Sequence, residues 1–235
     1  MTLLNAAAPA PSCYSRTVNE WLCMGYFEDR GDELMGATLD HLTITAAAVL
    51  LGLALALPLA LAARRFERLE SLILGFCTGL YTLPSLALFP LIVPFTGLSR
   101  TTVVVGLAIY SLTILVRNMI EGLRAVPPEV IESATGMGYS RGRLLWRVEL
   151  PMALPVIIAG LRIATVSTVA LATVGAIVYD GGLGILLLNG VNSNFRAQVL
   201  AVSLICVAMA LLLDLALLLA QRLSTPWTRT AGARG

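Results

Sequence analysis

The chain has 235 residues, of which 57% are hydrophobic and 13% are charged, and its formal net charge at pH 7 is +2. A soluble domain is usually about 45–50% apolar and about 25% charged, so this chain lacks the polar surface that water requires. The composition indicates a single membrane domain, and the small net charge gives no sign of a nucleic-acid partner.

Residues 1–38 form an N-terminal arm without the basic start, continuous apolar stretch and cleavage site of a signal peptide. Apolar residues recur near its end at helical spacing and favour a short interfacial helix: Leu34, Met35, Leu39 and Leu42. If the arm is extracytoplasmic, Cys13 and Cys23 could form a disulfide.

Five apolar segments follow, each near the length of about 20 residues that a membrane-spanning helix needs. They cover about 42–63, 72–95, 101–120, 154–178 and 197–220, within a membrane domain at 39–222. The second contains Pro84, Pro90 and Pro94. Because neighbouring helices can satisfy freed backbone groups, these prolines predict a kinked or broken span beside a cavity.

The placement of arginine predicts the orientation of the chain. The loops after the first and third spans and the tail at 223–235 hold eleven arginines with their membrane edges, against four on the other side. Because positively charged loops stay in the cytoplasm, we expect the N-terminus outside and the C-terminus and tail in the cytoplasm.

The longest predicted cytoplasmic loop, at about 127–151, has the pattern of two short helices joined by a glycine turn. Pro127 and Pro128 suit a helix start, Gly136 and Gly138 permit a turn, and Ser140 suits the cap of a second helix ending near Pro151. Taken alone, the pattern fits a docking element as well as a basic loop held by lipid headgroups.

This loop resembles the EAA loop of ATP-binding-cassette (ABC) importer permeases: Glu-Ala-Ala, three residues, Gly, nine residues and Ile-x-Leu-Pro. The spacing matches throughout, with Ser133 in place of alanine and Val148 in place of isoleucine. The resemblance implies an all-α type I importer permease fold with about five transmembrane helices, in which the loop docks on an ATPase subunit. The implied coupling residues are Glu132, Ser133, Ala134, Gly136, Gly138, Val148, Leu150 and Pro151.

From about His41 to Asp214 the chain is most similar to permeases of the glycine betaine, carnitine and choline type. The resemblance rests on Thr82–Leu88, Arg117-Asn118, Gly136–Gly138 and Gly181–Gly184, whereas Asp180 stands where many relatives have a small residue. It implies import of a quaternary-ammonium osmoprotectant across a bacterial cytoplasmic membrane by alternating access. The implied partners are ATPase subunits, a second permease subunit (the same chain or a relative), an extracytoplasmic solute-binding protein and membrane lipid.

The broken second span is the predicted lining of the solute path. Its candidate residues are Tyr81, Thr82, Pro84, Ser85 and Phe89, with simple packing as the alternative for the two aromatic side chains. All three tryptophans lie outside the spans, which argues against an aromatic cage for the cation within this chain. We therefore expect selectivity to reside mainly in the binding protein.

Other polar residues have several possible roles. Asp214 lies within the last span, where an ionisable residue is a functional hypothesis by default, although a place near a dimer seam or a serine or backbone partner is the alternative. Arg162 is expected to extend toward the cytoplasmic surface, His41 to lie at the outer interface, and Arg117 and Asn118 to cap the third span.

Three other readings are weaker. A permease of the same architecture for an amino acid remains the alternative. An intramembrane enzyme would need a nucleophile with a base or paired carboxylates at membrane depth, and a membrane scaffold would need no ATPase. The sequence has no G-x-x-x-x-G-K-[ST] loop and no metal-ligand spacing of cysteines, so we expect no bound cofactor or metal, and ATP to be used by a partner.

Overall fold

The computed structural model describes residues 12–227, and these residues form helices joined by short turns, without a strand. Four helical runs are long and apolar enough to cross a membrane, and a bent helix pair supplies a fifth span. The all-helical architecture with up to five spans is therefore confirmed. The helices are α1 (Met24–Asp29), α2 (Gly31–Arg65), α3 (Glu67–Thr82), α4 (Ser85–Thr96), α5 (Arg100–Arg124), α6 (Pro128–Gly136), α7 (Arg141–Leu144), α8 (Leu150–Ala172), α9 (Gly182–Asn192) and α10 (Arg196–Ser224).

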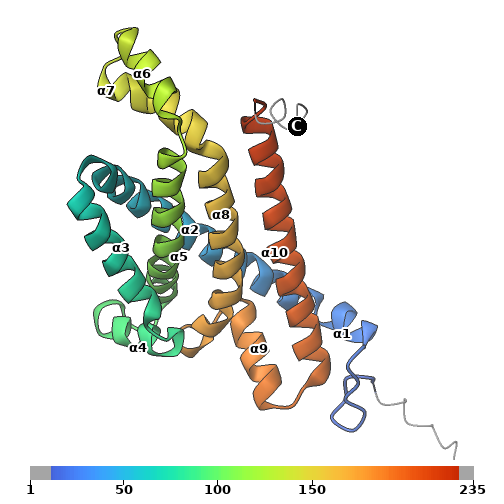
Figure 1. The fold of residues 1–235 in the computed structure, drawn as a ribbon. Helices are drawn as coiled ribbons and strands as arrows, with labels where there is room; N and C mark the ends of the chain where they lie inside the picture. Colours follow the sequence, from blue (N-terminus) through green and yellow to red (C-terminus); the bar gives the residue numbers. More distant parts are fainter. Residues whose placement is uncertain (1–11, 228–235) are drawn as a thin grey trace, which may run out of the picture.

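The third span, α5, is the core of the bundle. It packs against α2, α3, α4 and α8, while α10 packs against α8 and α9 (Figure 1). Within the most apolar stretch of each helix, 61% of α5 is buried inside the protein but only 11% of α10. The α10 surface is therefore left for lipid or another subunit.

The two ends of the bundle differ in what they carry. Figure 1 shows α6, α7 and the end of α10 at one end, and α1, α4 and the turn between α9 and α10 at the other. The turn between α2 and α3 lies at the same end as α6 and α7. The three arginine-rich regions thus share one end, as five crossings require.

Glycines allow the close approach of helices around α5. A Cβ on Gly52 of α2 would lie 2.2 Å from Ser111 Oγ, and one on Gly160 of α8 would lie 2.3 Å from Asn118 Cβ. Small residues at helix contacts let backbones pack closely in a membrane, where dispersion rather than the hydrophobic effect holds helices together.

Several predicted boundaries are wrong. Leu34, Met35, Leu39 and Leu42 lie within α2 itself and form no separate interfacial helix. Arg117 and Asn118 do not cap the third span, because α5 continues to Arg124 and Asn118 Nδ2 donates to the carbonyl of Ile114 at 2.8 Å.

Two further expectations fail for reasons of packing. The second loop helix does not end near Pro151 but runs through a π-helical turn (Leu145–Glu149) into α8. A wider π turn accommodates a proline ring that an ordinary helix would reject. His41 does not face the outer membrane interface, because its side chain is buried in the protein. It is 1% exposed, and its Nε2 lies 3.0 Å from the carbonyl oxygen of Val169.

Candidate functional site: the coupling loop and the broken second span

The first half of the predicted coupling motif lies on α6, which projects from the end of the bundle (Figure 1). Pro127 and Pro128 begin the helix as expected, and Glu129 lies in its first turn, where a carboxylate complements the helix dipole. Ala134 is buried against the rest of the loop, while Glu132, Ser133 and Gly136 are exposed. Glu132 and Gly136 are thus accessible to a partner.

The turn after α6 depends on Gly138. Its φ of +83° lies in the left-handed region that glycine adopts without steric cost. The amide of Gly138 donates to the carbonyl of Thr135 at 2.9 Å, and that of Tyr139 donates to the carbonyl of Ala134 at 3.1 Å. Nothing lies within 4 Å of the position that a Gly138 Cβ would occupy, so the turn is open to solvent. Of the two predicted turn glycines, Gly138 makes the turn and Gly136 ends the helix.

The second half of the motif lies in the stem below the projecting helices. Val148 is half-buried in the π turn, and Leu150 and Pro151 begin α8. Leu150 and Pro151 line an apolar groove of about 400 Å³ with residues of α2, α5 and the π turn, Trp146 among them. The structure therefore separates the motif into an exposed turn and a stem that packs on the spans.

Glu149 connects this stem to the first span. Its side chain is fully buried, and Oε1 accepts a hydrogen bond from Arg64 Nη2 at the end of α2. Its Oε2 has no hydrogen-bond partner among the described residues. A second ion pair at the same end joins Arg124 of α5 to Glu70 of α3, at 2.5 Å. Sequence reasoning gave Glu149 no role, although a carboxylate between Val148 and Leu150 was the available signal.

The second span breaks at Leu83 and Pro84. Both residues are extended, and the axes of α3 and α4 differ by 101° across them. The predicted break is thus confirmed at Pro84, whereas Pro90 and Pro94 lie inside α4.

Hydroxyl groups of α5 support the broken helix. Tyr110 Oη donates to the carbonyl of Leu83 at 2.5 Å, and Thr113 Oγ1 donates to the carbonyl of Cys77 at 2.7 Å. These bonds meet the condition that non-helical backbone at membrane depth be satisfied by protein. Sequence reasoning missed both residues, since a hydroxyl in the third span does not reveal which neighbour it faces.

The predicted path residues divide into two groups. Tyr81, Thr82 and Pro84 are exposed beside the break, and Ser85 is half-buried. Phe89 is 0% exposed and packs against Gly106 of α5, where a Cβ would lie 2.6 Å from its ring. Its packing alternative therefore holds, and Phe89 is removed from the path. Tyr81 is 46% exposed with its ring edge-on to Tyr110, at 5.8 Å between centroids.

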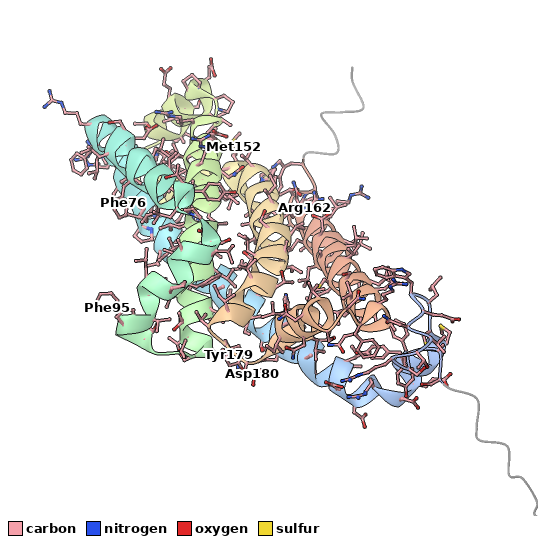
Figure 2. All side chains as sticks on the ribbon, turned by 90° about the horizontal axis from the view of Figure 1, so that it is seen from below. Phe76, Phe95, Met152, Arg162, Tyr179 and Asp180 are labelled. Atoms are coloured by element: carbon pink, nitrogen blue, oxygen red, sulfur yellow. A yellow bond between two sulfur atoms is a disulfide. The ribbon has the colours of Figure 1, made fainter. Side chains whose placement is uncertain are left out.

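Arg162 and Asp214 pair with one another, which neither expectation included. Arg162 Nε and Nη2 donate to Asp214 Oδ1 and Oδ2, each at 2.8 Å, so α8 and α10 are joined by a two-pronged ion pair. Figure 2 places Arg162 where α8 lies beside α10. Arg162 does not extend to the cytoplasmic surface. The partner that the structure gives Asp214 is this arginine, where a serine or a backbone group was the expected alternative.

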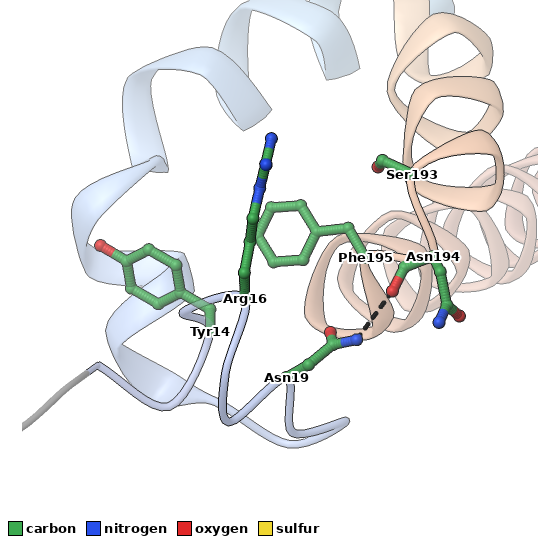
Figure 3. A pocket seen from close by; sticks show the side chains of 6 residues that line it. All are labelled: Tyr14, Arg16, Asn19, Ser193, Asn194 and Phe195. Carbon is green, nitrogen blue, oxygen red and sulfur yellow. Dashed lines mark hydrogen bonds between the residues drawn. The ribbon is translucent and has the colours of Figure 1, made fainter.

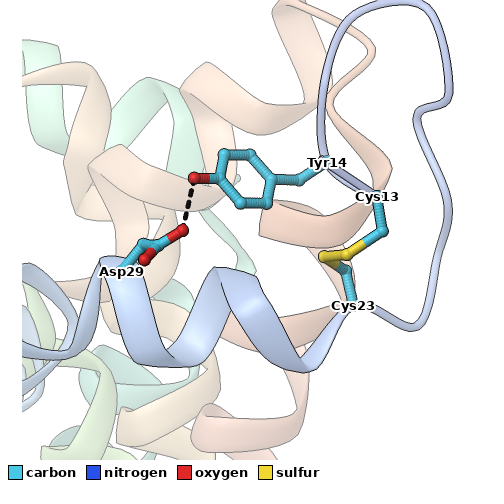
Figure 4. Close-up of a disulfide and its surroundings, with 4 residues drawn as sticks. All are labelled: Cys13, Tyr14, Cys23 and Asp29. Carbon is cyan, nitrogen blue, oxygen red and sulfur yellow. Dashed lines mark hydrogen bonds between the residues drawn. A yellow bond between two sulfur atoms is a disulfide. The ribbon is translucent and has the colours of Figure 1, made fainter. Parts of the chain in front are cut away.

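The N-terminal arm is fastened to itself and to the turn before α10. Cys13 and Cys23 form a disulfide, and Tyr14 donates to Asp29 Oδ2 at 2.5 Å (Figure 4). This hydrogen bond raises the pKa of Tyr14, and burial raises the pKa of Tyr26 to about 12.

The same arm borders a pocket of about 620 Å³ between its loop and the α9–α10 turn, lined by Tyr14, Arg16, Asn19, Ser193, Asn194 and Phe195 (Figure 3). Asn19 Nδ2 donates to the carbonyl of Asn194 at 2.8 Å, and Asn19 Oδ1 accepts from the amide of Arg196 at 3.0 Å. The arm is therefore docked on the bundle at the end opposite α6.

Comparison with known proteins gives consistent matches. The family model of the binding-protein-dependent transport system inner membrane component matches residues 48–230. The osmoprotectant import permease protein OsmW of Salmonella typhimurium is 35% identical and covers 86% of this chain and 96% of its own. The carnitine transport permease protein OpuCB of Listeria monocytogenes is 34% identical (82% and 88%). The choline transport system permease protein OpuBB of Bacillus subtilis is 32% identical (86% and 93%).

Solved structures support the fold. An inward-facing MetNI methionine ABC transporter matches with a TM-score of 0.74 at 21% identity, covering 82% of this chain and 96% of its own. An amino acid ABC transporter crystallised with histidines matches with a TM-score of 0.70 at 20% identity (86% and 98%). The architecture is thus that of ABC importer permeases.

Proposed function

Because this chain belongs to the family of binding-protein-dependent transport system inner membrane components, we propose that it is the permease subunit of an importer for a small quaternary-ammonium osmoprotectant. The observation that supports the solute class is the set of relatives at 32–35% identity named for carnitine, choline or osmoprotectant transport. The methionine and amino acid transporters are about 20% identical and share only the fold, so they do not favour an amino acid.

In this proposal an ATPase subunit binds the exposed turn around Glu132 and Gly138. Closure of the ATPase dimer moves this turn, and the motion reaches the first span through Glu149 and Arg64. The pair Arg124–Glu70 carries it to α3 and the break at Pro84. Packed helices joined by ion pairs at one end suit such rigid-body transmission, since they shift between discrete arrangements.

The proposed orientation places the arm outside and α6 in the cytoplasm. A disulfide between Cys13 and Cys23 is typical of an oxidising compartment, which favours an arm outside the cytoplasm. The arginine-rich ends of the spans favour the same orientation. A solute-binding protein would then approach the end that carries the arm and the α9–α10 turn.

This orientation makes a prediction about thiol labelling. In intact cells, a membrane-impermeant reductant followed by an impermeant maleimide should label Cys13 and Cys23. Cys77 is buried and should stay unlabelled, and Cys206 is replaced by alanine to remove the remaining thiol. Labelling of the arm only after the membrane is made permeable would show that the arm is cytoplasmic and that the proposed topology is wrong.

The function is tested by uptake in cells that lack the chain. Native sequence should restore uptake of at least one of labelled glycine betaine, carnitine and choline, and Glu132→Arg should reduce it at least about tenfold at equal membrane abundance. Exposed Glu132 has no ion-pair partner among the described residues, so the reversal of charge acts on a partner rather than on the fold. If the native chain restored uptake of an amino acid and of no quaternary amine, the proposed solute class would be wrong and an amino acid would take its place.

A further inference from the structure

The ion pair between Arg162 and Asp214 joins two helices that are long and apolar enough to cross the membrane, α8 and α10. Arg162 lies twelve residues after Leu150, where α8 begins, and Asp214 lies ten residues before Ser224, where α10 ends. At about 1.5 Å per residue both lie roughly 15–18 Å along their helices from these ends, which places them inside the apolar spans. Charges at this depth are expensive and mark ligand paths or contacts between helices.

This pair is not sealed inside the protein. The Arg162 side chain is 25% exposed and that of Asp214 32%, and both border a groove of about 380 Å³. The remaining lining is apolar except for one hydroxyl: Ala159, Ile163, Val166 and Ser167. If the ion pair served only to join α8 to α10, we would expect apolar packing to fill the groove beside it. Charged side chains that face lipid receive no stabilisation from water or from protein dipoles.

The groove lies on the side of α8 and α10 that α2 does not cover. Leu161 and Thr165 of α8 and Leu213 and Leu217 of α10 face α2 across a separate apolar cavity. The ion pair is carried by neighbouring positions that are turned away from it, and Figure 1 shows α2 passing behind α8. This side of α8 and α10 is open, so the groove is accessible from outside the chain.

We propose that this groove is a low-affinity subsite for a zwitterionic solute, an inference that rests on the proposed function. The Arg162 guanidinium faces the solute carboxylate, and the Asp214 carboxylate faces its quaternary ammonium. The contact to Asp214 engages two of the five N–H donors of the guanidinium, so the others remain for a carboxylate. A quaternary ammonium has no N–H donor and needs only an adjacent negative charge beside apolar walls.

Charge balance favours a zwitterion over a simple cation. An ion pair and an antiparallel zwitterion neutralise one another, so neither leaves an uncompensated charge at low dielectric. Choline, which has no carboxylate, would add a net positive charge to the groove. The subsite therefore prefers glycine betaine or carnitine to choline.

Replacing both charged side chains by apolar ones distinguishes a solute subsite from a contact that only joins α8 to α10. In Arg162→Met/Asp214→Leu the pair becomes apolar, a change that packing often tolerates. If the pair only joins α8 to α10, binding and uptake should stay near native. The subsite predicts at least a tenfold loss of glycine betaine binding to the purified permease–ATPase complex without binding protein, and a similar loss of maximal uptake rate.

The controls are a restored pair and a distant pair. Arg162→Asp/Asp214→Arg keeps one charge of each sign, and a solute can reverse its direction, so binding should lie within about threefold of native. Arg30→Met/Glu33→Leu removes the exposed pair of the arm, whose atoms lie 2.8 Å apart, and should have no effect. Co-purification with the ATPase reports assembly for every variant.

Each outcome decides the proposal. Native binding by the apolar pair, equal losses for glycine betaine and choline, or no binding of any zwitterionic solute by the native complex would each overturn the subsite. If the native chain imports no quaternary amine but takes up a zwitterionic amino acid that the apolar pair abolishes, the solute class fails and the subsite stands.

Discussion

Gly138→Ala should reduce ATP-driven transport several-fold or more, although it adds only one carbon atom. The backbone of Gly138 has a φ of +83°, and a left-handed conformation costs an L-residue with a side chain about 1–2 kcal/mol. The turn would relax to another shape and lose the surface that a partner recognises. Gly138→Trp should abolish co-purification with the ATPase, because its ring fills the space around the turn that is open in this chain.

Two matched variants separate backbone strain from added bulk. Gly142 is also exposed and has open space around it, but its φ is not positive, so Gly142→Ala should transport at the native rate. Gly138→Asn should retain more activity than Gly138→Ala, because asparagine tolerates the left-handed region better. Equal and native rates for all three would remove the turn from the coupling mechanism. The measurement is initial uptake rate, normalised to permease abundance.

Arg64→Ala should lower the free energy of unfolding by roughly 3 kcal/mol. We expect this loss to be larger than that of other single changes at the surface. The change leaves the Glu149 carboxylate fully buried without its cation, and Oε2 already has no partner among the described residues. Thermal unfolding of the purified complex in detergent measures the effect.

The double change Arg64→Met/Glu149→Leu should recover most of this loss, because it removes the buried carboxylate together with its half-exposed cation and leaves no buried charge unpaired. Transport by the double variant should nevertheless stay low if the pair carries motion from the loop to α2. Arg30→Ala breaks an exposed pair and gives the reference value. If Arg64→Ala lowered stability no more than Arg30→Ala, the pair would have no structural importance.

The sequence predicts features that depend on local chemistry. Long apolar runs give the spans, Pro84 gives the break in the second span, and the spacing from Glu132 to Pro151 gives the loop. Each signal lies within a few residues of what it determines, so one chain without its tertiary contacts is sufficient.

Features that depend on which helices meet could not be predicted. The contacts Arg162–Asp214, Arg64–Glu149 and Tyr110–Leu83 join residues 27 to 85 positions apart. Phe89 became a core residue only because Gly106 leaves room for its ring. A π turn before Pro151 overrode the usual helix-ending effect of proline, and no pattern in the residues marked it.

The central claim is that the turn at Gly138 couples an ATPase to import of a quaternary-ammonium solute through this chain. The most direct measurement is accumulation of labelled glycine betaine in vesicles that contain the purified complex and its binding protein, with ATP supplied on the side of α6. We predict ATP-dependent accumulation with the native chain and a loss of at least about tenfold with Gly138→Trp. ATP-independent accumulation, or equal rates for the two chains, would contradict the account.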